Sequence, residues 1–236
     1  MDQDILKTSW RQRILFIIIA VLMVFSFVAT YIAIVLSNKN SNTNSTDGDN
    51  SELTAIEEEY QKKSDEISKY AETLSSKYFN DFKGYKSQVK SYNATTANSE
   101  GLKTTDLKEG TGRELKADDT DYLAYYIGWC ADESIFDSSF DDAENPTSLK
   151  APIYAANGLI EGWNQGVIGM KLGGVREITI PGELAYGEDQ EICGGTNSPL
   201  KFVVLPFDDE KMIKLGKESN EIMERLYAAY YSSSSN

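Results

Sequence analysis

Residues 159–170 read "LIEGWNQGVIGM", and this stretch decides the fold. Leu159, Trp163 and Val167 recur at helical spacing, which places them on one face of a short helix. Glycine is a poor helix former, so Gly162, directly before Trp163, must serve something other than helix propensity. Close packing of a neighbouring backbone over the indole is one explanation. An ordinary helix buried under a sheet is the alternative.

Composition excludes several classes of function. The chain has 236 residues and a formal net charge of −14, which argues against nucleic-acid binding because phosphate contacts need clustered lysine and arginine. It contains no histidine, which removes Ser–His and Cys–His nucleophile pairs and most zinc sites. Its two cysteines, Cys130 and Cys193, form no CxxC motif. We therefore expect no metal and no cofactor.

An uncharged apolar run occupies residues 14–36. Its 23 residues, at about 1.5 Å rise each, are enough to cross a bilayer. A cleaved signal peptide is the alternative, but its apolar core is shorter, about 7–15 residues. Three basic residues, Lys7, Arg11 and Arg13, precede the run, whereas only Lys39 lies close behind it. Residues 1–13 should therefore be cytoplasmic and the chain beyond the run outside. The pattern predicts a single-pass signal anchor.

The segments between the anchor and the folded domain are predicted to be a linker and a helix. Residues 37–52 are polar and of low complexity, which is typical of a flexible linker. Residues 53–92 contain a broken heptad with Lys63 on its seam, which predicts a helical spacer; a weak coiled coil that self-associates through residues 53–82 is the alternative. Residues 210–236 are predicted to form a helical tail that packs on the domain or on the spacer.

Short strands dominate residues 99–209. The stretch "TDYLAYYIGW" (120–129) alternates, so Tyr122, Ala124, Tyr126 and Gly128 should share one face of a sheet. "VREITI" (175–180) and "LKFVVLPF" (200–207) predict two further strands. The pattern indicates one α+β domain in which an antiparallel sheet is wrapped around the short Trp163 helix.

Five phrases together resemble one family, the FKBP-type peptidyl-prolyl cis–trans isomerases. They occur in the family's order and are "YIGW" (126–129), "IFDSSF" (135–140), "LIEGWNQGVIGMKLGGVREITIP" (159–181), "ELAYGE" (183–188) and "SPLKFVV" (198–204). The resemblance implies an FKBP-like fold in which Trp163 forms the floor of a proline-sized pocket. The walls would then be Tyr126, Phe136, Leu159, Ile160 and Phe202, with Ile192 in the loop that overhangs the pocket.

The resemblance also implies the catalytic groups and the substrate. Asp137, Tyr186 and the backbone N–H of Ile160 would act on Xaa-Pro segments of exported or unfolded proteins, without covalent chemistry. Asp137 has a second interpretation, in which its carboxylate only joins neighbouring strands through hydrogen bonds. A lone signal anchor with such a domain looks bacterial, so we expect a cell-membrane protein whose isomerase domain lies outside the cytoplasm.

The loop after Tyr186 departs from the family pattern. Where relatives commonly have prolines, this chain has Cys193, Gly194 and Gly195. Two cysteines in an exported domain are usually paired, so a Cys130–Cys193 bridge is predicted, with two separate buried thiols as the alternative. Two other functions stay open: a non-catalytic module that binds proline-containing partners, and a chaperone that binds unfolded chains through apolar surface on the spacer or the tail.

Overall fold

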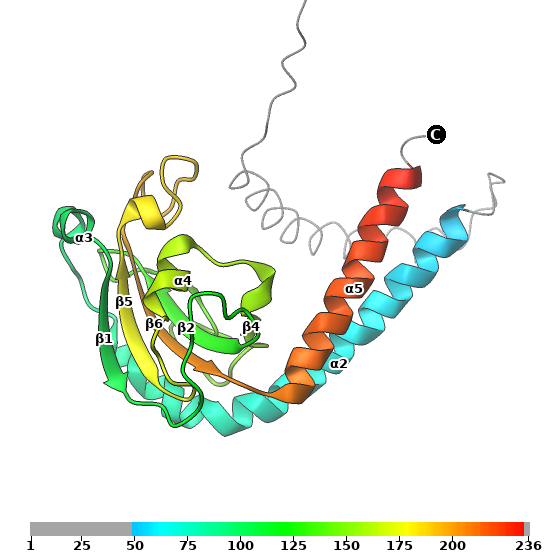
Figure 1. The fold of residues 1–236 in the computed structure, drawn as a ribbon, viewed down its shortest axis with the longest axis horizontal. Coiled ribbons are helices and arrows are strands. Elements are labelled where there is room, and N and C mark those ends of the chain that lie inside the picture. Colours follow the sequence, from blue (N-terminus) through cyan, green and yellow to red (C-terminus); the bar gives the residue numbers. More distant parts are fainter. Residues whose placement is uncertain (1–48, 234–236) are drawn as a thin grey trace, which may run out of the picture. The chain divides into compact units, whose positions relative to one another are not determined.

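The computed structural model describes residues 49–233, and Figure 1 shows the order of its elements. Two long helices flank a domain of short strands and short helices. The helices are α2 (Asp49–Lys83), α3 (Ala94–Glu100), α4 (Glu161–Gly166) and α5 (Glu210–Ser233), with 3-10 turns at Gly84–Gln88, Ala155–Asn157 and Gly182–Leu184. The strands are β1 (Lys103–Lys108), β2 (Leu123–Trp129), β3 (Ile135–Ser138), β4 (Ile153–Tyr154), β5 (Val175–Ile180) and β6 (Leu200–Phe207).

The strands form one six-stranded antiparallel sheet in the order β1-β5-β6-β2-β3, with β4 paired to β2. Strands β5 and β6 have the bounds expected from "VREITI" and "LKFVVLPF". The predicted α+β architecture, an antiparallel sheet against the Trp163 helix, is confirmed. Strand β1 and helix α3 were not predicted, because "KTTDLK" is polar and exposed along most of its length and "ATTANSE" has no apolar stripe.

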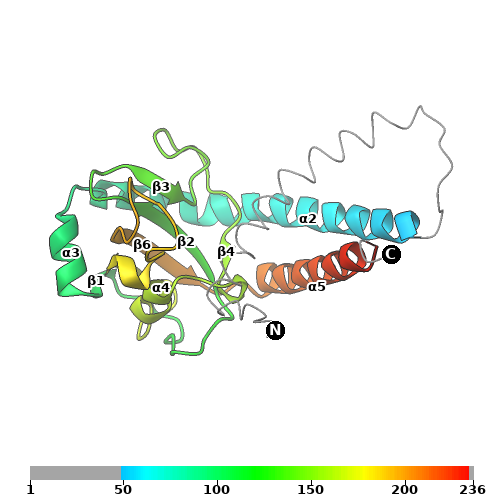
Figure 2. The same ribbon diagram turned by 90° about the horizontal axis from the view of Figure 1, so that it is seen from above.

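The alternation expected in β2 is present, and both faces of the strand are buried. Ala124 and Tyr126 face the cluster that contains α4, whereas Leu123, Tyr125 and Ile127 face the cluster that contains α2. Figures 1 and 2 show the sheet between these two helices. The sheet therefore separates two apolar layers, and the functional site must lie in the α4 layer, where the family-like residues converge.

The two glycines of α4 allow the helix to lie directly on β5. A Cβ atom at Gly162 would be 2.2 Å from the Cγ2 atom of Ile180, and one at Gly166 would be 2.6 Å from the Cγ2 atom of Ile178. Any larger residue would push the helix away from the strand. The glycines thus serve close packing, as expected, but against strand side chains rather than a backbone above the indole.

The segment expected to be a spacer is in part a layer of the domain. The C-terminal half of α2 packs its apolar side chains, among them Leu74 and Phe82, on the sheet. The rings of Tyr78 and Phe207 have centroids 4.5 Å apart. Residues 70–92 therefore cover a sheet face, and only the first part of α2 extends beyond the domain.

The tail helix α5 packs antiparallel against that first part of α2, as Figures 1 and 2 show. Ile56 of α2 lies in one cluster with Ile222 and Leu226 of α5. Lys63, the polar residue on the predicted heptad seam, pairs with Glu218 of α5 at 2.7 Å. The structure shows both positions expected for the tail, because Met212 at the start of α5 packs in the cluster of the sheet and the later part of α5 packs on the spacer. The heptad side chains are thus covered within one chain, and self-association through residues 53–82 stays a prediction.

The predicted anchor, residues 14–36, lies outside the described residues, as do residues 1–13 and most of the 37–52 linker. None of the helices within residues 49–233 combines the length and the apolar character that crossing a bilayer requires.

Candidate functional site

The floor of the site consists of two aromatic side chains, Trp163 from α4 and Phe202 from β6. Trp163 is 2% exposed and Phe202 is 5% exposed. Their ring centroids are 5.4 Å apart and the planes meet at 77°, an edge-to-face arrangement that aromatic pairs favour. Phe202, expected in the wall, belongs to the floor.

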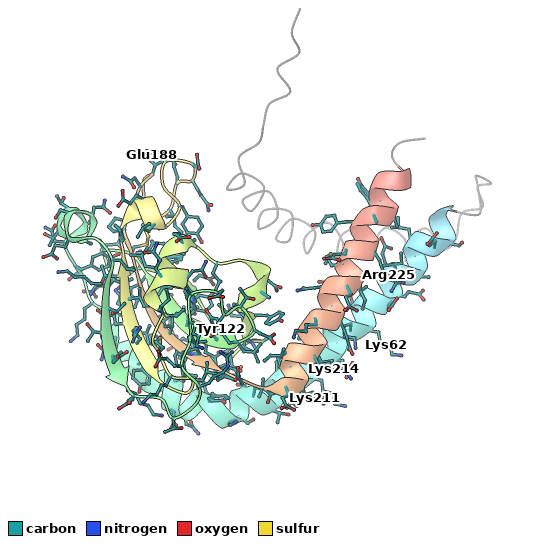
Figure 3. All side chains as sticks on the ribbon, in the orientation of Figure 1. Lys62, Tyr122, Glu188, Lys211, Lys214 and Arg225 are labelled. Atoms are coloured by element: carbon teal, nitrogen blue, oxygen red, sulfur yellow. A yellow bond between two sulfur atoms is a disulfide. The ribbon has the colours of Figure 1, made fainter. Side chains whose placement is uncertain are left out.

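A hydrogen bond fixes the orientation of the indole. Nε1 of Trp163 donates to the hydroxyl of Tyr122 over 3.2 Å. Tyr122, labelled in Figure 3, directly precedes β2 and is 1% exposed. Burial raises the pKa of this tyrosine, so the hydroxyl stays neutral and able to accept. Sequence reasoning placed Tyr122 on the correct face but assigned it no role; its position four residues before Tyr126 was the available signal.

Two further rings, from β2 and β3, stand on this floor. Tyr126 meets Trp163 edge-on at 5.6 Å and 84°, and Phe136 meets Phe202 at 5.6 Å and 89°. Gly128 makes room for the rings of Phe136 and Phe202, because a Cβ atom there would lie 2.8 Å from the first and 2.7 Å from the second. These four rings, where the family resemblance implies a proline-sized pocket, are called the aromatic pocket below.

The remaining predicted wall residues border the aromatic pocket. Leu159, Ile160, Tyr186 and Ile192 are half-buried and pack against the same apolar cluster as Trp163. Solvent therefore reaches the walls and the rim but little of the indole. The structure brings together all nine predicted site residues, the other five being Tyr126, Phe136, Asp137, Trp163 and Phe202.

Ile160 presents an unused backbone donor at the rim. It is the N-cap of α4, with φ −62° and ψ 151°, and its carbonyl accepts from the N–H groups of Trp163 and Asn164 at 3.0 and 3.2 Å. Its own N–H has no acceptor among residues 49–233. Gly158, at φ +89°, allows the chain to turn into this position. The N–H group is available to a substrate carbonyl.

Asp137 and two tyrosines form the polar side of the site. The hydroxyl of Tyr126 donates to Oδ2 of Asp137, and Oδ1 of Asp137 accepts from the N–H of Ser138 at 2.8 Å. The carboxylate therefore holds β3 against β2, as its structural interpretation expects, while it remains exposed at the rim. Within the described part of the chain, no three carboxylate or cysteine side chains are grouped to hold a metal ion.

Among the hydroxyls of the site, that of Tyr186 has no hydrogen-bond partner within the described part of the chain. Burial, and then the charge of Asp137, raise the pKa of Tyr186, and the same two causes raise that of Tyr126. Both phenols are therefore neutral at physiological pH. The Tyr126 hydroxyl is used by Asp137, whereas the Tyr186 hydroxyl makes no hydrogen bond within residues 49–233 and can donate to a ligand.

Comparison with known proteins identifies the family. The model of the FKBP-type peptidyl-prolyl cis-trans isomerases matches residues 112–205, a range that contains the whole site. An FK506-binding protein of Neisseria meningitidis serogroup B is 38% identical over 87 residues, which are 37% of this chain and 75% of the relative. The chain belongs to the FKBP-type peptidyl-prolyl cis–trans isomerases.

Two further proteins are similar to this chain, one over a longer stretch of sequence and one in a solved structure. The FKBP-type peptidyl-prolyl cis-trans isomerase FkpA of Aeromonas hydrophila is 33% identical over 173 residues, which are 70% of this chain and 60% of that protein. The crystal structure of AtFKBP13 superposes on this isomerase with a TM-score of 0.36 and 28% identity, covering 48% of this chain and 95% of that one.

The loop over the pocket of this isomerase is held by a disulfide bond. Cys130, after the last residue of β2, is bonded to Cys193 with a Cα–Cα distance of 5.5 Å, which confirms the predicted bridge. Ile192 and Gly195 exchange backbone hydrogen bonds of 3.0 and 3.2 Å around Cys193 (φ +57°) and Gly194 (φ +82°). Two consecutive positive φ values are typical of a tight hairpin turn. The bridge and the turn together fix the position of Ile192 in this loop.

Proposed function

We propose that this isomerase catalyses the cis–trans isomerisation of Xaa-Pro bonds in exported proteins at the aromatic pocket, without covalent chemistry. The observation that carries the proposal is the pairing of an apolar surface with two unused donors. The N–H of Ile160 and the hydroxyl of Tyr186 border the rings of Trp163 and Tyr126 and have no acceptor within the described residues. A prolyl ring and the carbonyls beside it supply the matching apolar surface and acceptors.

Such a pocket is chemically sufficient because no bond breaks in the reaction. The barrier to rotation, ~18–20 kcal/mol, is the loss of amide resonance. A catalyst therefore has only to bind the twisted amide better than the planar one. Apolar walls disfavour the charge-separated planar form, since water no longer solvates its carbonyl oxygen. Each ~1.4 kcal/mol gained in this way is about tenfold in rate.

The polar residues then have separate tasks. The Tyr186 hydroxyl and the Ile160 N–H donate to carbonyls of the bound peptide and orient it over Trp163. Asp137, held by Tyr126, places a negative charge at the rim near the twisting amide. Phe136, Leu159 and Ile192 exclude water from the proline.

We further propose that residues 14–36 anchor the enzyme in a bacterial cell membrane, with residues 1–13 cytoplasmic and the domain outside. The uncharged run and the basic residues before it support this orientation. The Cys130–Cys193 bridge also supports it, because structural disulfides persist in oxidising compartments.

Two experiments test these proposals. Cis–trans exchange of a panel of Xaa-Pro peptides, measured by NMR with the full chain, should be accelerated at catalytic enzyme concentrations; an unchanged exchange rate excludes the isomerase mechanism. Protease added to intact cells after outer-layer permeabilisation should remove the domain and leave the anchor. A domain that is cleaved only after lysis contradicts the orientation.

The alternative is a non-catalytic module or chaperone that binds proline-containing partners. Peptide binding without accelerated exchange would favour it. Among the large apolar side chains of the described residues, only Ile168 and Tyr230 are exposed, and the apolar faces of α2 and α5 cover each other. This observation favours the enzyme over a general chaperone that uses the spacer or the tail.

A further inference from the structure

A cavity of about 260 Å³ lies beside the aromatic pocket, between α5 and the segment that leads into α4. Met212 and Ser219 line it from α5 and Ile67 from α2, while Ile153 and Leu159 line it from the domain. The elements that carry these residues are α2, α5, β4 and the segment before α4, and Figure 1 shows their arrangement. No lining residue is charged, although the chain has a net charge of −14.

Specific hydrogen bonds join α5 to the domain around the cavity. Nδ2 of Asn220 donates to Oδ1 of Asn157 over 2.7 Å at one side of the cavity. At the other, Asp121 accepts from the hydroxyl of Tyr154 at 2.7 Å and from Nζ of Lys217 at 3.0 Å. Lys217 and Asn220 thus join α5 to the domain by hydrogen bonds in the C-terminal half of the α5 segment that lines the cavity.

Helix α5 also approaches the domain closely at Gly216, one residue before Lys217. A Cβ atom at Gly216 would lie 3.2 Å from the Tyr154 ring, so glycine lets the helix pass over it. The lining is mainly apolar, with Asn157, Ser219 and Asn220 as uncharged polar residues and six apolar side chains from Ile67, Leu123, Pro152, Ile153, Leu159 and Met212. Such a space accepts an apolar group and offers an ion no oppositely charged partner.

Leu159 connects the cavity to the isomerase site. Its side chain lines the cavity and also packs in the cluster of Trp163, and the next residue is Ile160, whose N–H faces the substrate. A client bound at the aromatic pocket thus has the cavity beside it, one wall residue away. An extended chain advances ~3.3 Å per residue, so only a few residues separate the two places.

We propose that this cavity, here named the α5 subsite, takes an apolar side chain of the same client, a few residues from the proline. The proposal rests on the proposed isomerase function. The α5 subsite makes the enzyme prefer unfolded segments in which a large apolar residue accompanies the proline, which is the composition that exposed core segments have. The tail helix would then determine specificity for the reaction at Trp163.

The first test measures kcat/KM on two classes of peptide with the full chain in lipid nanodiscs. The first class is a short Ala-Pro peptide that reaches the aromatic pocket only. The second is a Gly/Ser peptide with one proline and a single phenylalanine placed two to seven residues before or after it. We expect kcat/KM to rise roughly fivefold to tenfold at one or two placements of phenylalanine.

Filling the α5 subsite should remove this gain and nothing else. Ser219→Leu projects a larger apolar side chain from α5 into the cavity, and Ala228→Leu is the matched control on the exposed side of the same helix. We expect Ser219→Leu to keep the activity on the short peptide and to lose the phenylalanine gain, and Ala228→Leu to keep both. No gain at any placement, or a gain that survives in Ser219→Leu, overturns the subsite. If the parent chain shows no activity on the short peptide, the result would instead overturn the isomerase function.

A second measurement needs no variant. The best phenylalanine is replaced by a photo-reactive phenylalanine analogue, and the crosslinked residues are mapped by mass spectrometry. Crosslinks to residues 212–220 and 152–159 support the proposal. Crosslinks confined to other surfaces overturn it. The proposal is also overturned if an excess of the short Ala-Pro peptide leaves the crosslinks unchanged while a peptide of residues 37–48 abolishes them, because the linker would then be the occupant of the cavity.

Discussion

The indole nitrogen of Trp163 lies 3.2 Å from the hydroxyl of Tyr122 and donates a hydrogen bond to it, with both side chains almost completely buried. One residue belongs to the shortest α-helix of the described chain and the other precedes a central strand. The bond therefore fixes the floor of the aromatic pocket relative to the sheet, beneath the point where the substrate's proline is proposed to bind.

Tyr122→Phe should destabilise the protein by about 1–3 kcal/mol and lower kcat/KM. The substitution leaves a buried indole N–H without an acceptor, which costs its desolvation. Tyr126→Phe is the matched control for stability alone, because Asp137 is exposed and water can replace the lost partner. Urea denaturation and peptide exchange check the pair. Equal stability of the two variants would show that the Tyr122 bond contributes little.

Trp163→Ala should weaken turnover strongly, and Tyr186→Phe should weaken it modestly, roughly threefold to tenfold. The first removes the floor, whereas the second removes one hydrogen bond of about 0.5–1.5 kcal/mol. The protease-coupled prolyl peptide assay measures both, with circular dichroism as the check on folding and Trp163→Phe as the milder variant. If both variants equal the parent in turnover, the site assignment is wrong.

The residues of the pocket could be predicted because their side chains occur in short local phrases. Periodicity placed Trp163 on a helix and Tyr126 on a strand face, and the family resemblance supplied Asp137 and Tyr186. No single phrase of the sequence shows that these residues lie close together in the fold. It depends on pairings of β2 with β3 and β6, which join residues distant in sequence.

The structure of the α2 and α5 helices could be predicted only in outline. The heptad pattern indicated a helix, but an apolar stripe does not state what covers it. Here a sheet face covers Phe82 and Leu74, and α5 covers Ile56. Lys63 on the seam was the available signal, since a lysine there needs an acidic partner, and Glu218 provides it.

Removing the disulfide by Cys130→Ser with Cys193→Ser should lower stability by up to ~4 kcal/mol, because the bridge spans 63 residues. Turnover should also fall, since Cys193 adopts a positive φ and the turn beside Ile192 loses its tether. Denaturant titrations and exchange rates measure both effects. Dithiothreitol should reproduce them in the parent and have no effect on the double variant. An effect of the reductant on the double variant would assign the change to another cause.

Gly162→Ala should cost about 1–3 kcal/mol of stability and lower activity. Its Cβ atom would be 2.2 Å from Ile180, so α4 and its indole must move away from β5. Gly84→Ala is the control, because a Cβ atom there meets nothing within 4 Å and a restricted unfolded chain slightly favours folding. Thermal denaturation separates the two. A neutral Gly162→Ala would mean that the helix-strand contact tolerates a methyl group.

Activity should be independent of pH between about pH 6 and 9. The chain contains no histidine, and burial raises the pKa of both site tyrosines, Tyr126 and Tyr186, so neither ionises in this range.

Stability should follow a different course at high pH. A tyrosine whose pKa is higher in the folded state contributes stability that is complete below its unfolded pKa of about 10 and is lost as the pH rises through the folded value. For Tyr154, whose pKa is raised to about 12 by burial and by Asp121, the loss falls between about pH 10 and 12. Exchange rates and urea denaturation at matched pH values check both statements. A bell-shaped rate profile between pH 6 and 9 would require a titrating catalytic group and would contradict catalysis by neutral donors at the aromatic pocket.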